Sequence, residues 1–233
     1  MGQLTLVRHA QASFFGADYD QLSALGLEQA QRLGQYYASQ RVVFDRVFVG
    51  PRRRHHQTCE CVAAAYRAAG LDFPAPIELA ELDEHHGTAV MKQELGIPDA
   101  AGPSLHAAEH DPAERERAVR RFFQSYSVVM RDWARGTVGA TGIENWAEFR
   151  ARSLRALDLL CGDSGRNVAF TSGGLVSSAT GWLLDLDDER VIDLSIVLRN
   201  TALTEVAWSN RRRSLVSFNA LPHLPDPAAA TAV

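Results

Sequence analysis

The sequence has little cysteine and no long apolar run, and each shortage excludes a class of protein. Its three cysteines, Cys59, Cys61 and Cys161, are too few for a disulfide framework, and their odd number favours a reducing compartment. No apolar run reaches the ~20 residues that a membrane-spanning helix needs. Residues 3–7 are too short for the core of a signal peptide, and no basic region precedes them. We therefore expect a soluble, cytoplasmic protein with no membrane partner.

Lysine is almost absent as well, because Lys92 is its one occurrence and arginine supplies nearly all of the positive charge. The formal net charge is -4, so the overall charge gives no indication of a nucleic-acid partner. Cys59 and Cys61 are separated by one residue and have too few further ligands nearby to close a tetrahedral shell. The sequence predicts no metal site.

The chain is long and apolar enough to form one large α/β domain, with 233 residues of which 46% are hydrophobic. Apolar runs typical of strands alternate with stretches of helical periodicity, which predicts a three-layer α/β/α sandwich with a mostly parallel sheet. Ser23 is the expected N-cap of the first helix. The expected strands are residues 4–7, 42–49, 74–79, 167–171, 196–208 and 214–218, and the expected later helices are 53–69, 113–135, 144–161 and 175–184.

Residues 96–113 contain three prolines and two glycines, a composition that favours a loop or a mobile lid. We expect a single domain over residues 1–224, with a mainly helical insertion at about 85–150. Such insertions often cover a site and select its substrate. The Pro/Ala-rich residues 225–233 are expected to form a disordered tail.

The most informative motif is the pair Arg8-His9, which directly follows the first apolar run. Ligands bind beyond the carboxyl ends of the strands in open α/β folds, so this pair is expected at the site. Arginine holds phosphate by planar, charge-assisted hydrogen bonds, and histidine can act as a nucleophile or as an acid or base near neutral pH. The alternative is a surface histidine beside a solvated arginine.

Two further strand ends carry groups suited to anion binding. Arginines occupy positions 52–54 after the second strand, and Ser172-Gly173-Gly174 follows the fourth strand at the start of a helix. Helix N-termini offer unpaired N–H groups and a partial positive charge, so these ends could cradle an oxyanion. Glu84 or Glu81, in the loop after the third strand, could protonate a leaving oxygen.

The segment Leu6-Val7-Arg8-His9-Ala10-Gln11 resembles the signature of the histidine phosphatase superfamily, the phosphoglycerate mutase-like group, although Ala10 stands where the family usually has glycine. Other segments resemble the family's pattern in the same order, so the resemblance spans almost the whole chain. They are residues 22–30, 51–58, 82–84, 200–205 and 219–224. The resemblance implies a phosphoglycerate mutase-like fold.

The resemblance also implies a mechanism. His9 would accept the phosphoryl group of a small phosphate ester as a phosphohistidine, with Arg8 and Arg54 holding the phosphate oxygens. An acid, Glu84 or alternatively Glu81, would release the alcohol. No metal or organic cofactor is implied. The other residues expected to bind substrate are Gln11, Ser13, Ser172 and Gly173, although Gln11 and Ser13 could instead only cap the turn.

One departure from the family pattern concerns position 172, where the resemblance places a second histidine and this chain has Ser172. A serine donates one neutral hydrogen bond, whereas a charged donor forms a bond about twice as strong. Removal of a single oxyanion donor can lower a rate by about 10²–10³-fold. We therefore expect a weakened or specialised phosphatase. One hypothesis is that His85 or His86 fills the gap.

Two alternatives to a phosphomonoester hydrolase stay open. A phosphoglycerate mutase must retain the donor phosphate and exclude water, and Ser172 makes that less favoured. A catalytically silent member would bind a phosphorylated ligand without turnover, which the changes at Ala10 and Ser172 allow. The sequence does not identify the substrate or the oligomeric state.

Overall fold

A six-stranded sheet in the order β3-β2-β4-β1-β5-β6 forms the centre of the computed structural model, which describes residues 1–13, 20–96 and 112–232. Strands β1 to β4 pair in parallel, and β5 and β6 add antiparallel pairs at one side. The prediction of a mostly parallel sheet is therefore confirmed. The strands are β1 (Gly2–Arg8), β2 (Arg46–Val49), β3 (Ile77–Glu78), β4 (Gly165–Thr171), β5 (Leu203–Trp208) and β6 (Arg213–Ala220).

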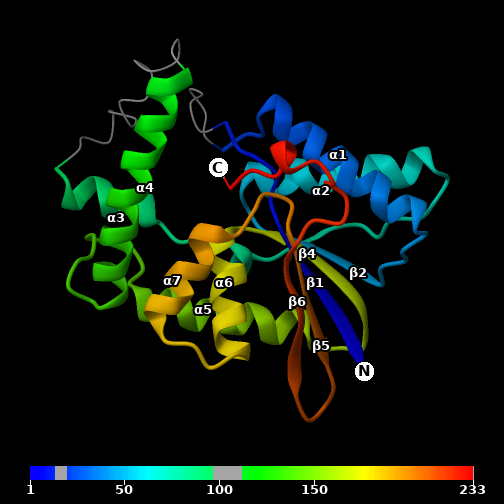
Figure 1. Cartoon of the computed structure of the whole chain (residues 1–233). Coiled ribbons are helices and arrows are strands. Elements are labelled where there is room, and N and C mark those ends of the chain that lie inside the picture. Colours follow the sequence, from blue (N-terminus) through cyan, green and yellow to red (C-terminus); the bar gives the residue numbers. More distant parts are fainter. Residues whose placement is uncertain (14–19, 97–111, 233) are drawn as a thin grey trace.

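Helices cover both faces of the sheet, as the three-layer prediction requires (Figure 1). Strand β1 is buried on both faces, since Leu4 and Leu6 pack with residues of α5 and α6 while Val7 packs with residues of α1 and α2. Burial on both faces is typical of parallel strands. The helices are α1 (Ala24–Ser39), α2 (Arg53–Ala68), α3 (Gly87–Glu94), α4 (Pro112–Ala134), α5 (Trp146–Leu160), α6 (Gly173–Leu183) and α7 (Asp188–Val197).

Short polar side chains start two of these helices. Ser23 caps α1 as predicted, because its Oγ accepts a hydrogen bond from the N–H of Gly26 at 3.0 Å. Asn145 caps α5 and forms a capping box with Glu148. Each cap satisfies N–H groups that have no partner inside the helix, which defines where the helix begins.

A third apolar cluster lies among α3, α4, α5 and α7, within and beside the range of the expected helical insertion. Its largest buried side chains include Met130, Trp133 and Phe149. Residues 97–111, which make up most of the expected lid, lie outside the described residues. Among the described residues, no helix is long and apolar enough to cross a membrane.

Two sequence predictions are wrong at the C-terminal end of the chain. The expected strand 196–208 begins only at Leu203, because α7 starts at an Asp187 N-cap and continues to Val197. The expected disordered tail instead packs on the sheet domain. Thr231 accepts a backbone hydrogen bond from Asn200 at 2.7 Å, and the amide of Gln29 donates to the Ala229 carbonyl at 2.8 Å.

Candidate active site

The carboxyl ends of β1, β2 and β4 meet at one edge of the sheet. The register pairs Arg8 with Thr171 and Val49 with Phe170, so the three strands end side by side. Just beyond these ends, the N–H of His9 donates to the Thr171 carbonyl at 2.8 Å. This brings His9 close to the first residues of α2 and of α6.

His9 is buried, with 4% of its surface exposed, and its hydrogen bonds define its tautomer. Nδ1 lies 2.7 Å from the Ala10 carbonyl, which can only accept, so Nδ1 carries the proton. Nε2 therefore holds a lone pair, and it accepts from Nε of Arg54 at 3.1 Å. Burial holds the pKa of His9 well below its usual value, and the charges of Arg54 and Arg8 lower it further. The ring is a neutral base near pH 7.

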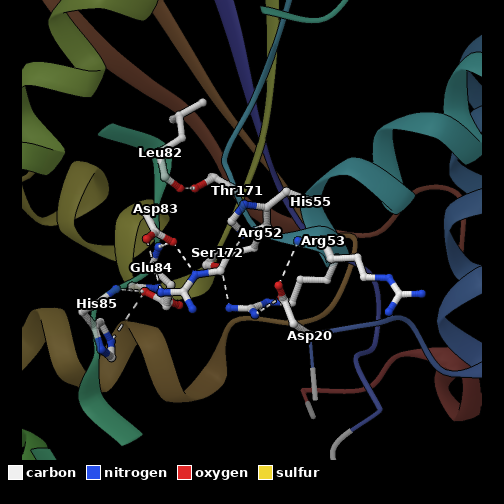
Figure 2. Close-up of polar contacts among 12 residues, drawn as sticks. Asp20, Arg52, Arg53, His55, Leu82, Asp83, Glu84, His85, Thr171 and Ser172 are labelled. Atoms are coloured by element: carbon white, nitrogen blue, oxygen red, sulfur yellow. Dashed lines mark hydrogen bonds and ion pairs between the residues drawn. The ribbon is translucent and has the colours of Figure 1, made fainter. Parts of the chain in front are cut away.

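Arg54 connects several groups of the site from the first turn of α2. Besides His9, its guanidinium contacts Asp20 through Nη1 at 2.6 Å and Ser172 through Nη2 at 3.4 Å. The neighbouring arginines point elsewhere: Arg52 forms an ion pair with Asp83, and the exposed side chain of Arg53 extends away from Ser172 (Figure 2). The prediction made no mention of Asp20, which lies in no motif that sequence reasoning could have used.

Ser172 is fully buried at the N-cap of α6, and the imidazole beside it is His55. Nε2 of His55 lies 2.6 Å from the Ser172 hydroxyl oxygen. His55 is thus the imidazole that contacts Ser172, whereas the ring of His85 lies against Trp133, 5.4 Å between centroids, and His86 is exposed. His55 was missed because it lies inside the segment read as carrying the second arginine.

The Glu84 carboxylate lies at the start of α6. Its Oε2 accepts from the Gly174 N–H at 3.2 Å, and its Oε1 accepts from the His85 N–H at 3.0 Å. Burial raises the pKa of Glu84, but His85, Arg54 and these N–H groups together hold it below its usual value. A Cβ on Gly174 would lie 2.3 Å from Oε1, so a glycine is needed there for the carboxylate to approach.

The alternative acid, Glu81, lies on the preceding turn, Ala80–Leu82. Its backbone carbonyl accepts from Arg152 at 3.0 Å, and its side chain is half-buried. The third carboxylate of this loop, Asp83, is engaged by Arg52. Glu84 is thus the loop carboxylate that contacts the backbone at the start of α6.

The other predicted substrate-binding residues differ in their surroundings. Arg8 lies beside Gly173 at the start of α6, and its guanidinium donates to the carbonyls of Leu198 and of Ala232, the latter at 2.9 Å. The amide oxygen of Gln11 accepts from the Ser23 hydroxyl at 2.7 Å, next to the cap of α1. The backbone N–H of Ser13 donates to Gln21 at 2.7 Å. The geometry at Gln11 agrees with the capping alternative.

The site is therefore suited to an anion. Among the described residues, no group of three or more His, Cys, Asp or Glu side chains could hold a metal ion. Positive charge comes from Arg54 and Arg8, and the N-terminus of α6 adds backbone N–H groups.

A comparison with protein families shows to which family the chain belongs. The profile of the histidine phosphatase superfamily (branch 1) matches residues 4–118 and 113–221. The chain belongs to this superfamily. A search of curated proteins gives no match.

Several solved structures share this histidine phosphatase fold. A phosphoserine phosphatase from Entamoeba histolytica in complex with 3-phosphoglyceric acid is 18% identical, with 96% of this chain and 100% of that chain covered and a TM-score of 0.63. An alpha-ribazole phosphatase from Shigella flexneri is 19% identical, with 94% and 96% covered and a TM-score of 0.63. A phosphoglycerate mutase from Bacillus anthracis is 15% identical, with 96% and 95% covered and a TM-score of 0.61. At these identities the likeness shows the fold.

Proposed function

We propose that the protein is a phosphomonoester hydrolase that forms a phosphohistidine at Nε2 of His9. The observation that carries this proposal is the state of that ring, which is buried and neutral, with Nδ1 bound to a carbonyl and the Nε2 lone pair facing Arg54. A lone pair held beside a guanidinium is suited to attack an anion that the same guanidinium binds. The names of the structural neighbours, which include phosphoserine phosphatase and alpha-ribazole phosphatase, support a small phosphate ester as substrate.

The first step transfers the phosphoryl group to the enzyme. Arg54, Arg8 and the N-terminus of α6 hold the phosphate oxygens, and they stabilise the charge of the transition state. Nε2 of His9 attacks phosphorus, the bond from phosphorus to the ester oxygen breaks, and the carboxyl group of Glu84 gives its proton to that oxygen. A phosphate beside Glu84 raises the pKa of the carboxyl group, because like charges disfavour ionisation.

The second step returns the enzyme to its initial state. The Glu84 carboxylate takes a proton from water, the water oxygen bonds to phosphorus, and the bond from phosphorus to Nε2 breaks with its electron pair returning to the ring. The products are inorganic phosphate, a neutral His9 and a protonated Glu84. Every group in the cycle comes from the chain, the substrate or water.

Hydrolysis of 4-nitrophenyl phosphate tests the proposal directly. We expect turnover by the wild type and a loss of at least about 10⁴-fold in His9→Ala, because the nucleophile is gone. The matched control is His56→Ala, whose ring pairs with Glu78 at 2.9 Å on the outer side of α2 and should keep its activity. Unchanged turnover in His9→Ala would overturn the proposal.

The same assay series separates the alternatives. Interconversion of phosphoglycerates with little release of phosphate would indicate a mutase. Binding of phosphate or vanadate without turnover of any ester would indicate a silent member. A cytoplasmic location and a single domain over residues 1–224 stay predictions from the sequence.

A further inference from the structure

His55 is a fully buried imidazole that the mechanism above does not use. Its exposed fraction is 0%, and its Nε2 lies 2.6 Å from the Ser172 hydroxyl oxygen. Its ring centroid is 5.7 Å from that of His9, so it lies at the reacting end of the site. Burial of a polar ring is unfavourable unless it gains hydrogen bonds, and Ser172 supplies one here.

The end of β2 makes room for this ring. A Cβ on Gly50 would lie 2.4 Å from Nδ1 of His55 and 2.7 Å from the Leu82 carbonyl oxygen. A side chain at position 50 would therefore displace the ring from Ser172. Gly50 thus leaves space for the His55 ring, and Ser172 contacts Nε2 of that ring.

We propose that His55 is a positioning residue that orients and polarises the Ser172 hydroxyl, so that the pair donates a hydrogen bond to the transferring phosphoryl group in place of the histidine that the family resemblance puts at position 172. This inference rests on the proposed function and deepens it.

The hydrogen-bond geometry gives the reason. Nδ1 of His55 has no hydrogen-bond partner in the described part of the chain, which favours the ring proton on Nε2, from where it donates to the Ser172 oxygen. The hydroxyl proton must then point to another acceptor. Arg54 reaches the same oxygen with Nη2 at 3.4 Å and is also a donor, so it cannot accept that proton. Phosphoryl oxygens held by Arg54 would be the acceptor. Two donors to one hydroxyl oxygen make its own proton a stronger donor, since hydrogen bonds in a chain polarise one another.

Relocation of the imidazole tests this role. Loss of one oxyanion donor predicts that His55→Ala lowers kcat for 4-nitrophenyl phosphate by about 10²–10³-fold, with a much smaller change in KM. Ser172→His alone should also have a low kcat, because the new ring would clash with that of His55. The double variant His55→Ala with Ser172→His should recover to within about tenfold of the wild type, since one imidazole again serves the same place. A residue that only fills space at position 55 would not be rescued by a ring at position 172.

A binding measurement covers the case in which the double variant does not fold. Orthovanadate resembles the transition state, so calorimetry should show its affinity falling by about 10²-fold in His55→Ala while inorganic phosphate loses less than about fivefold. His56→Ala, on the next residue of α2, is the matched control and should bind both anions as the wild type does.

The outcomes separate the two proposals. If His55→Ala keeps wild-type kcat and vanadate affinity while His9→Ala is inactive, the role of His55 is wrong and the phosphohistidine mechanism stands. The role of His55 would also be wrong if the double variant is not rescued and His55→Ala loses equal affinity for phosphate and vanadate. If the wild type neither hydrolyses esters nor binds phosphate, the proposed function itself is wrong.

Discussion

The edge of the sheet where β1, β2 and β4 end buries charged and polar side chains, whereas the cluster among α3, α4, α5 and α7 buries almost entirely apolar ones. His9 and Arg54 are each 4% exposed at the sheet edge, and Trp133 and Phe149 are at most 1% exposed in the helical cluster. Buried polar groups are retained at a cost in stability when they serve chemistry, while apolar groups mainly stabilise.

The loop between β3 and α3 joins these two regions. His85 packs edge-on against Phe149 with ring centroids 5.1 Å apart, and the Oε1 of Glu84 lies 3.6 Å from Nε2 of His85. The helical cluster thus contacts the site through the loop that carries Glu84, and the other groups proposed for the reaction lie at the sheet edge. Substitutions in the two regions should therefore differ in kind.

The largest effect is expected at the sheet edge. Arg54→Ala should lower kcat/KM for 4-nitrophenyl phosphate by about 10³-fold or more, because the guanidinium that contacts His9 and Ser172 is lost. Arg53→Ala is the matched control one residue away and should stay within about twofold, since its side chain is exposed. Steady-state kinetics of the two variants decide this, and equal losses would contradict the assignment of Arg54.

The next largest effect is expected in the loop between β3 and α3, which joins the two regions. Glu84→Gln should lower kcat for an alkyl phosphate by about 10²–10³-fold, because an alkoxide leaves poorly without a proton. With 4-nitrophenyl phosphate the transfer step should change much less, since 4-nitrophenolate is a weak base. Glu81→Gln should show neither pattern. If Glu81→Gln gives the larger loss on the alkyl ester, the two acids must be exchanged.

Substitution in the helical cluster should affect stability more than chemistry. Trp133→Ala should lower the free energy of unfolding by about 3–5 kcal/mol, as expected for a large buried side chain. At a temperature where the variant is folded, kcat for 4-nitrophenyl phosphate should fall less than about tenfold. Urea titration and kinetics on one preparation would measure both. A loss of kcat as large as that of Arg54→Ala would remove the distinction between the regions.

The smallest effect is the pH dependence of stability. Burial lowers the pKa of His223 to about 4, whereas an unfolded histidine titrates near 6.5. The unfolded chain therefore binds more protons below pH 6.5, so stability is present above that pH and is lost as the pH falls towards 4. His223→Gln should remove about 1 kcal/mol of the loss between pH 7.5 and 5.5, whereas Trp133→Ala should leave that difference unchanged. Urea unfolding at the two pH values tests this, and an unchanged pH dependence in His223→Gln would contradict it.

Short sequence patterns were enough to predict a strand and a helix cap that depend on neighbouring residues. The apolar run before Arg8 became β1, Ser23 caps α1, and the family resemblance singled out Arg54 among three adjacent arginines. The prediction failed for the segment that begins at Ile196. Its β-branched residues favour a strand, but they end a helix that starts at the Asp187 cap, which the prediction did not recognise.

The contacts of His55 and Asp20 could not be predicted for a different reason. Each depends on where chain segments far apart in sequence meet: His55 is 117 residues from Ser172, and Asp20 is 34 residues from Arg54. No periodicity or spacing encodes such a meeting. The packed C-terminal tail was missed likewise, since its bonds go to Asn200 and Arg8.

The central claim is that His9 carries the phosphoryl group, and trapping that intermediate tests it most directly. The Glu84→Gln variant should form the phosphoenzyme from 4-nitrophenyl phosphate, whose leaving group needs no proton, and should hydrolyse it slowly because the base that activates water is missing. Quenching in alkali and peptide mass spectrometry should then locate an acid-labile, base-stable phosphoryl group on His9. It should be absent when His9→Ala is combined with Glu84→Gln. Release of 4-nitrophenol with the phosphoryl group on another residue, or on none, would contradict the account.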